Sequence, residues 1–212
     1  MRTILKGREP ASLTEHRATP GADYDGYRDK DTLRAYLVAE QRGLCCYCLS
    51  RIYPEYRLMK IEHWHCQANH TTEQLDYSNL LGSCLGNQGH KDEHCDTRKG
   101  KRDLSRNPAN PAHRVEDVIH FQSDGRIRST DPAFDTELND VLKLNLPFLV
   151  KNRIATLDAL LSELKALDKR GPWSREVLEK RLQDWNGESN TGDLRPFCQV
   201  AVYYLRKRLA RL

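Results

Sequence analysis

The chain has 212 residues, of which 30% are charged and 38% hydrophobic, and its formal net charge is +4. This length suits one sizeable core, or a compact domain with a helical annex. No run approaches the roughly 18 apolar residues that a membrane-spanning helix needs, and the first residues lack the apolar core of a signal peptide. We therefore expect a cytoplasmic protein. The mild positive charge allows a nucleic-acid partner but does not demonstrate one.

The N-terminal residues 1–30 are expected to form an extended arm. The stretch 8–30 is rich in Pro, Gly, Asp and Tyr and shows no hydrophobic periodicity. Asp31 is suited to cap a helix of roughly 32–42, whose apolar residues share one face at helical spacing. Gly43 is expected to end that helix, directly before the first cysteines.

Residues 31–107 are expected to form one cysteine- and histidine-rich module. Six of the seven cysteines lie between positions 45 and 95, and in a reducing compartment clustered Cys-x-x-Cys spacing indicates a metal rather than disulfides. Zinc prefers four thiolate or imidazole ligands in a tetrahedron. Cys45 and Cys48 have the usual spacing for one half of such a site, and Cys84 and Cys95 are expected to supply the other half.

Two alternatives to this zinc site stay open. Ten residues separate Cys84 from Cys95, where two would be normal, and His90 and His94 lie in that interval as rival ligands. The other alternative is that the cysteines are reduced core residues that bind no metal.

Around the cysteines, the pattern predicts short elements of both types. Arg57–His63 is typical of a strand, and the polar residues 66–78 are typical of a loop. Residues 79–81 should return to the core. A short helix is expected to begin near Asp96 and to end by Gly100.

The pair Glu62-His63 at the end of the predicted strand has the chemistry of phosphodiester hydrolysis. His63 is suited to be the general base, because the ordinary pKa of histidine lies near neutrality. Glu62 points to the opposite side of an extended segment and could hold a metal ion, with Asp96 as the second protein ligand. Mg²⁺ or Mn²⁺ suits two carboxylates completed by waters and phosphate oxygens. Asn79 is expected to brace the loop that carries His63.

Basic residues cluster beside the last cysteine of the module. We expect them to contact nucleic-acid phosphates, and a solvated helix end is the alternative. They are Arg98, Lys99, Lys101 and Arg102.

The remainder of the chain is expected to be a small hairpin followed by helices. Residues 108–130 form the hairpin or linker, because apolar residues flank the turn sequence Ser123-Asp124-Gly125. Residues 131–212 are expected to be mostly helical, with helices near 174–185 and 195–211. A preceding helix carries one apolar stripe, made of Ile154, Leu157, Leu161 and Leu164.

Taken together, these motif residues resemble the HNH endonucleases. Their signature is an acid followed by His, an Asn in a loop, and an Asn, His or Asp just after the last zinc-knuckle cysteine, with Lys three residues on. Here it becomes Glu62-His63, Asn79 and the run Cys95 to Lys99. The resemblance implies an α+β fold with a zinc-braced, treble-clef-like ββα-metal core and a mostly helical C-terminal region. It also implies catalytic roles for the residues that match the signature: Glu62, His63, Asn79 and Asp96.

Three further segments resemble the HNH proteins of Septu-type and retron-associated anti-phage systems. They are Gln41–Cys48, Leu75–Leu81 and Leu142–Arg153. This resemblance implies a DNA endonuclease that works with an ABC/SMC-like ATPase partner protein. RNA such as tRNA is the alternative substrate. The alternative class is a catalytically inactive, zinc-dependent module that binds nucleic acid or the ATPase.

Overall fold

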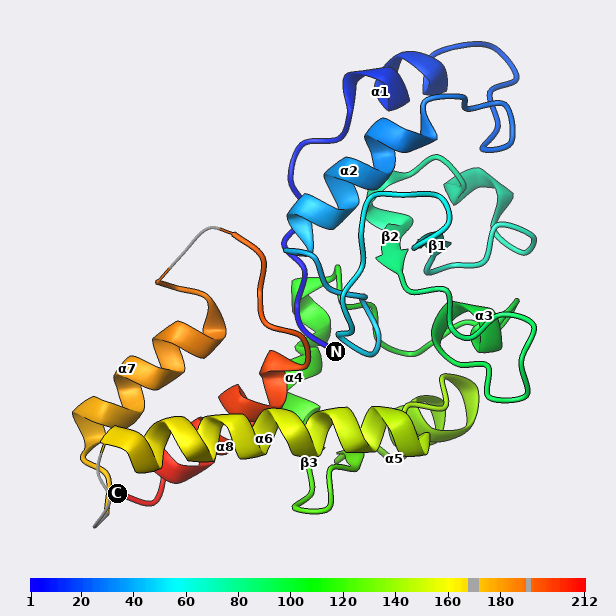
Figure 1. Ribbon diagram of the computed structural model, residues 1–212. Helices are drawn as coiled ribbons and strands as arrows, with labels where there is room; N and C mark the ends of the chain where they lie inside the picture. Colours follow the sequence, from blue (N-terminus) through cyan, green and yellow to red (C-terminus); the bar gives the residue numbers. More distant parts are fainter. Residues whose placement is uncertain (168–171, 190–191) are drawn as a thin grey trace.

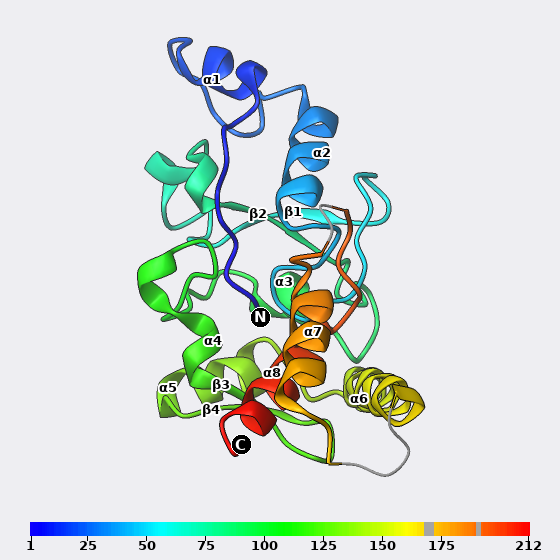
Figure 2. The ribbon, with the colours of Figure 1, turned by 90° about the vertical axis from the view of Figure 1, so that its left-hand side faces the viewer.

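The chain is α+β, with two small antiparallel sheets set among helices; a computed structural model describes residues 1–167, 172–189 and 192–212. Along the chain the helices are α1 Ala11–Arg17, α2 Lys30–Glu40, α3 Cys95–Lys99, α4 Val115–Val118, α5 Pro132–Thr136, α6 Pro147–Leu167, α7 Arg175–Asn186 and α8 Cys198–Leu209. Short 3-10 turns lie at Thr71–Glu73, Tyr77–Asn79 and Pro111–His113, and a π-helical turn lies at Glu137–Val141. Figures 1 and 2 both place α1 and α2 at one end of the molecule and α6, α7 and α8 at the other.

The first sheet pairs β1 (Lys60–His63) with β2 (Leu80–Ser83). In this antiparallel register Glu62 lies opposite Leu81, and His63 lies opposite Leu80. Both leucines are fully buried, as expected for residues that return to the core. The predicted strand is therefore confirmed in its second half, and its last two residues are Glu62 and His63.

The N-terminal segment differs from the extended arm that we expected, because Ala11–Arg17 forms α1. Pro10 precedes this helix, and proline is suited to a helix start because its fixed φ fits and its missing N–H is not needed there. Leu13 is fully buried in a cluster with Tyr27 and Leu33. Burial of this one side chain against α2 stabilises a helix too short to persist alone.

Helix α2 begins at Lys30, with Asp29 rather than Asp31 in the N-cap position. Its end is followed by Gly43, whose φ is +75° and whose N–H donates to the Val38 carbonyl at 2.9 Å. A Cβ at this position would collide with the Arg51 side chain. Glycine is therefore favoured by the positive φ, and a larger residue would also displace the end of the Arg51 side chain.

The second sheet confirms the predicted hairpin, since β3 (Ile119–Phe121) pairs with β4 (Ile127–Ser129) across the Ser123–Gly125 turn. The helical character of the C-terminal region is likewise confirmed, over α5 to α8. None of the helices in the described residues is both long and apolar enough to cross a membrane.

The stripe that the sequence suggested on α6 is confirmed at Leu164, which is buried, and at Leu157, which packs against two buried clusters, but not at Ile154. Ile154 is 38% exposed, whereas Leu160 and Leu164 are fully buried together with Leu149 and Arg153. Arg153 donates to the carbonyl of Gly125 at 2.6 Å and to that of Leu144 at 2.6 Å. Arg153 is buried although it is charged, and its neighbour Ile154 is apolar although it is exposed. The pattern of apolar residues therefore pointed to Ile154 instead of Arg153.

The largest buried cluster draws on distant parts of the chain. Met1, the cysteine turn, Phe134, Leu149 and Val200 all belong to it. Both the N-terminal segment and α8 therefore pack around the region that carries the cysteines.

Candidate functional site

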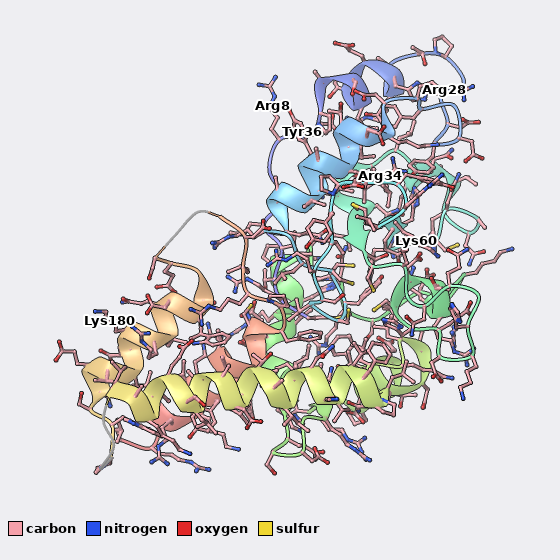
Figure 3. All side chains as sticks on the ribbon, in the orientation of Figure 1. Arg8, Arg28, Arg34, Tyr36, Lys60 and Lys180 are labelled. Carbon is pink, nitrogen blue, oxygen red and sulfur yellow. The ribbon has the colours of Figure 1, made fainter. Side chains whose placement is uncertain are left out.

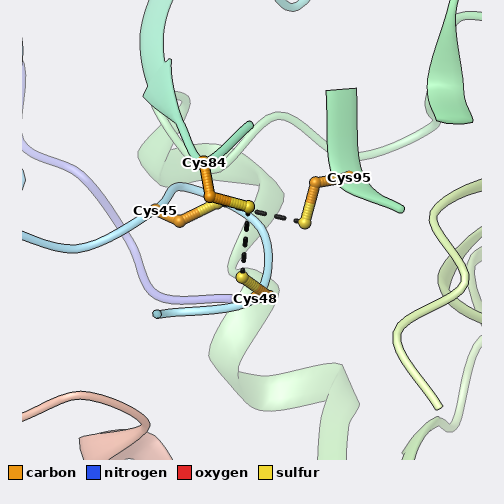
Figure 4. A group of neighbouring side chains, drawn as sticks. All are labelled: Cys45, Cys48, Cys84 and Cys95. Atoms are coloured by element: carbon orange, nitrogen blue, oxygen red, sulfur yellow. Dashed lines mark hydrogen bonds between the residues drawn. The ribbon is translucent and has the colours of Figure 1, made fainter. Parts of the chain in front are cut away.

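Four cysteines converge where the 45–48 turn, the end of β2 and the start of α3 meet (Figure 4). The Sγ atoms of Cys45 and Cys95 lie 4.0 Å apart, and those of Cys48 and Cys84 lie 3.8 Å apart. Four thiolates at about 2.3 Å from one zinc ion in a tetrahedron would be about 3.8 Å from one another. All four are free thiols, so the cluster fits a structural metal such as zinc.

The surroundings of Cys45 favour a thiolate. Burial opposes its ionisation, but hydrogen bonds from the neighbouring thiols outweigh burial and hold the pKa of Cys45 well below its usual value. A thiolate is the form in which cysteine binds metal. The pKa of Cys48 is lowered as well, whereas a hydrogen bond with Cys45 raises the pKa of Cys84 and burial raises that of Cys95, so two of the four thiols favour the thiolate without a metal.

The two histidines that competed for a ligand role lie outside this group of thiols. His90 is exposed on the loop between Cys84 and Cys95. His94 is buried, but its Nε2 lies 3.7 Å from Cys84 Sγ, at a hydrogen-bond distance for sulfur, and its ring packs against Phe148. His94 is thus a neighbour of the thiols that can orient Cys84.

Glu62 is 2% exposed and lies in a buried polar group between β1 and α3. The Tyr47 hydroxyl donates to its Oε1 at 2.7 Å, and Lys99 Nζ lies 2.7 Å from the same oxygen. Lys99 also donates to the His63 carbonyl at 2.9 Å. Burial and the neighbouring Asp96 raise the pKa of Glu62 well above its usual value, and Lys99 opposes that rise. The buried pair of Glu62 and Lys99 fastens β1 to α3.

This pairing changes the picture of the basic group that we expected to contact phosphate. Lys99 is 1% exposed, so in this conformation it cannot reach a phosphate. Arg102 donates to the carbonyls of Arg98 and Lys99, where it caps the end of α3. Arg98 and Lys101 remain exposed, and their charges are available to a ligand.

His63 is held as a neutral imidazole with a defined tautomer. Its Nε2 lies 3.0 Å from the Gln74 carbonyl, which can only accept, so Nε2 carries the proton and Nδ1 keeps its lone pair. Burial lowers the pKa of His63, which keeps the ring neutral near pH 7. The Tyr24 ring packs edge-on against it, with centroids 4.4 Å apart. His63 is only 8% exposed, because Tyr24 covers it.

Asn79 binds the loop that follows His63 through three side-chain hydrogen bonds. Its Nδ2 donates to the carbonyls of His65 at 3.1 Å and Glu73 at 3.2 Å. Its Oδ1 accepts from the His65 N–H at 2.7 Å. These are the bonds expected of a residue that braces this loop.

Asp96 lies beside Glu62 at the start of α3. Its carboxylate is 3.6 Å from Lys60 Nζ, and its negative charge acts on Glu62, His63 and Tyr24. In the view of Figure 3, Lys60 lies between Arg34 and α3. The side chain of Asp96 is 20% exposed and that of Glu62 only 3%, so Asp96 is the member of this pair of acids that solvent can reach.

Several residues of this site escaped sequence reasoning. Tyr24 and Tyr47 come from other parts of the chain, and no motif points to them. Lys60 had a usable signal, because residues two apart on a strand share a face, and Lys60 precedes Glu62 by two.

Comparisons with known proteins add no assignment. No family model matches the chain, and a search of curated proteins finds no match. The function is therefore argued from the geometry of the site.

The buried ion pair predicts a large effect of Lys99→Ala. The substitution leaves the Glu62 carboxylate buried without its cation, so the free energy of unfolding should fall by about 3–5 kcal/mol. Chemical denaturation measures this change. Lys101→Ala, at an exposed position, is the control and should stay within about 0.5 kcal/mol of the original protein. Equal effects of the two substitutions would contradict the role of Lys99.

The thiol cluster predicts a cobalt signature. Cobalt-substituted protein should show a thiolate-to-cobalt charge-transfer band in the near ultraviolet. Cys48→Ser should weaken this band and lower the thermal unfolding midpoint. Cys66→Ser should leave both unchanged, because Cys66 lies outside the cluster. A band that survives Cys48→Ser at full strength would rule out this ligand set.

The cover over His63 predicts that Tyr24→Ala exposes the imidazole. Its modification by diethyl pyrocarbonate, followed by peptide mass spectrometry, should become several-fold faster. Tyr36→Ala is the matched control, because Tyr36 is an exposed tyrosine on α2. If His63 reacts at the same rate in both variants, Tyr24 is not its cover.

Proposed function

We propose that this chain is a metal-dependent endonuclease of the HNH type, which hydrolyses phosphodiester bonds of DNA. The observation that carries the proposal is the meeting of two carboxylates, Glu62 and Asp96, beside the neutral imidazole of His63. A thiol cluster that fits zinc supports the same elements. This combination supplies a base and a cation site on one frame, as hydrolysis of a phosphodiester requires.

In this proposal His63 is the general base. Its Nε2 keeps its proton and donates it in a hydrogen bond to the Gln74 carbonyl, so Nδ1 can accept a proton from the attacking water. Asn79 fixes the loop that follows His63, and Lys99 holds the His63 carbonyl. These bonds fix the backbone at and after His63, and the Gln74 carbonyl orients the ring itself.

Glu62 and Asp96 would hold Mg²⁺ or Mn²⁺, which when bound stabilises negative charge on the phosphate and the leaving oxygen. Lys60 takes the place that Lys99 was expected to fill. It lies beside Asp96, and its side chain is 25% exposed, so it can contact a phosphate oxygen. Arg98 and Lys101 would contact further phosphates of the bound nucleic acid.

A zinc-braced binding module without catalysis is the second candidate. The observation in its favour is that Glu62 is neutralised by Lys99 and His63 is covered by Tyr24. Under the nuclease proposal, Tyr24 must move off His63 and Lys99 must release Glu62 before the enzyme can cut. The resemblance to anti-phage HNH proteins provides a partner for that step, an ABC/SMC-like ATPase, and a role as the nuclease of a two-component defence system.

A cleavage assay separates these candidates. The protein is incubated with plasmid DNA and, separately, with total RNA, in Mg²⁺ or Mn²⁺ and in chelator. Cutting should require the metal and fall by about 10²–10⁴-fold in His63→Ala. It should fall likewise in Asp96→Asn, which loses the proposed ligand.

His90→Ala is the matched control, because His90 is exposed and outside the site. Cleavage of RNA alone would assign the other substrate. The assay is repeated with Tyr24→Ala, in which the proposed cover is removed. If that variant also leaves both nucleic acids intact, with the ATPase present, the binding module is the better assignment.

A further inference from the structure

A second group of metal-ligating side chains lies in the loop between β1 and β2. His65, His70 and Glu73 each offer one ligand atom, and these atoms lie within 4.8 Å of one another. His65 Nδ1 is 2.6 Å from Glu73 Oε2. The group shares no residue with the thiol cluster or with the pair of Glu62 and Asp96.

Asp103, from a different segment of the chain, lies next to this group of three residues and contacts it through His70. It follows α3, and its Oδ2 lies 2.9 Å from His70 Nε2. The side chains of His65 and His70 are 31% and 30% exposed, and those of Glu73 and Asp103 are 39% and 43% exposed. The four groups therefore line a half-buried site that an ion can reach from solvent.

The ligand set is that of a transition-metal ion. Two neutral imidazoles and two carboxylates carry a net charge of about −2, which one divalent ion compensates. Without a metal, each histidine can pair with its acid only as an ordinary hydrogen bond or a protonated ion pair. We propose that His65, His70, Glu73 and Asp103 bind a divalent transition-metal ion such as Zn²⁺.

Binding requires a small rearrangement of the imidazoles. The rings of His65 and His70 are stacked, with centroids 4.5 Å apart and planes at 21°. Nitrogen lone pairs lie in the ring plane, so one ring must turn for both to point at a single ion. His70, whose side chain is 30% exposed, is the ring that would turn, and its contact with Asp103 would be replaced by contacts of both side chains with the ion.

The ion would clamp two segments that already touch. Asn69 Nδ2 donates to the Lys101 carbonyl at 3.0 Å, across the same boundary that His70 and Asp103 span. The His65 N–H is bonded to Asn79, so the clamp fixes the loop directly after His63. This role goes beyond the proposed nuclease activity and does not depend on it.

Cobalt binding tests the site, because cobalt reports ligand type as well as number. Full-length protein is titrated with Co²⁺ in excess Mg²⁺, while equilibrium dialysis counts bound ions and the near-ultraviolet band reports thiolate ligands. His70→Ala and Glu73→Gln should each bind one cobalt ion fewer than the original protein. Their thiolate band should be unchanged, because the four cysteines are intact.

His90→Ala is the matched control and should bind as many ions as the original protein. Asp96→Asn should lose any ion that is held at the proposed catalytic site. The cobalt count of this variant therefore tests the nuclease proposal separately from the site at His70 and Glu73. Equal cobalt counts in the original protein, His70→Ala and Glu73→Gln would overturn the assignment. So would loss of the thiolate band in either variant, because the change would then lie in the cysteine cluster.

Discussion

The four cysteine thiols hold three separate pieces of chain in one place: the 45–48 turn, the end of β2 and the start of α3. The sulfur–sulfur distances of Cys45 to Cys95 and of Cys48 to Cys84 are those of a tetrahedral metal site, in which one ion would join all three pieces. Because Asp96 directly follows Cys95, the position of the acid is set by the position of the thiol. Binding of a structural metal is therefore coupled to the geometry of the acidic site.

The buried pair of Glu62 and Lys99 adds a second link between β1 and α3. Removing two charges from water costs free energy, and such a pair is often no more stable than apolar side chains of the same size. Its presence is better explained by what it positions. Lys99 bonds both the Glu62 carboxylate and the His63 carbonyl, so one ammonium group fixes two neighbouring residues of β1. The free energy spent on burying the two charges therefore fixes the positions of Glu62 and His63 relative to each other.

The N-terminal segment contributes to the site from a distance. Tyr27 and Leu13 anchor it in a buried cluster, and Tyr24 then lies on the His63 ring. The Tyr24 N–H also donates to the Gln74 side chain at 3.1 Å, and the Gln74 carbonyl accepts from His63. Tyr24 also packs against the same buried cluster, and the Lys30 ammonium lies 4.5 Å from its ring centroid. The cover over His63 is therefore part of the packing of the N-terminal segment.

The sequence alone determined the local features: the Cys-x-x-Cys turn, the strand that ends in Glu62-His63, the hairpin near Gly125 and the helical C-terminal region. Spacing and periodicity are short-range, so they identify such features without knowledge of the fold. Only the tertiary structure decided that Lys99 turns inward to Glu62, that Tyr24 covers His63 and that α6 buries Arg153. Each of these depends on a partner far along the chain, and burial of a charge becomes possible only when that partner supplies the compensating contact.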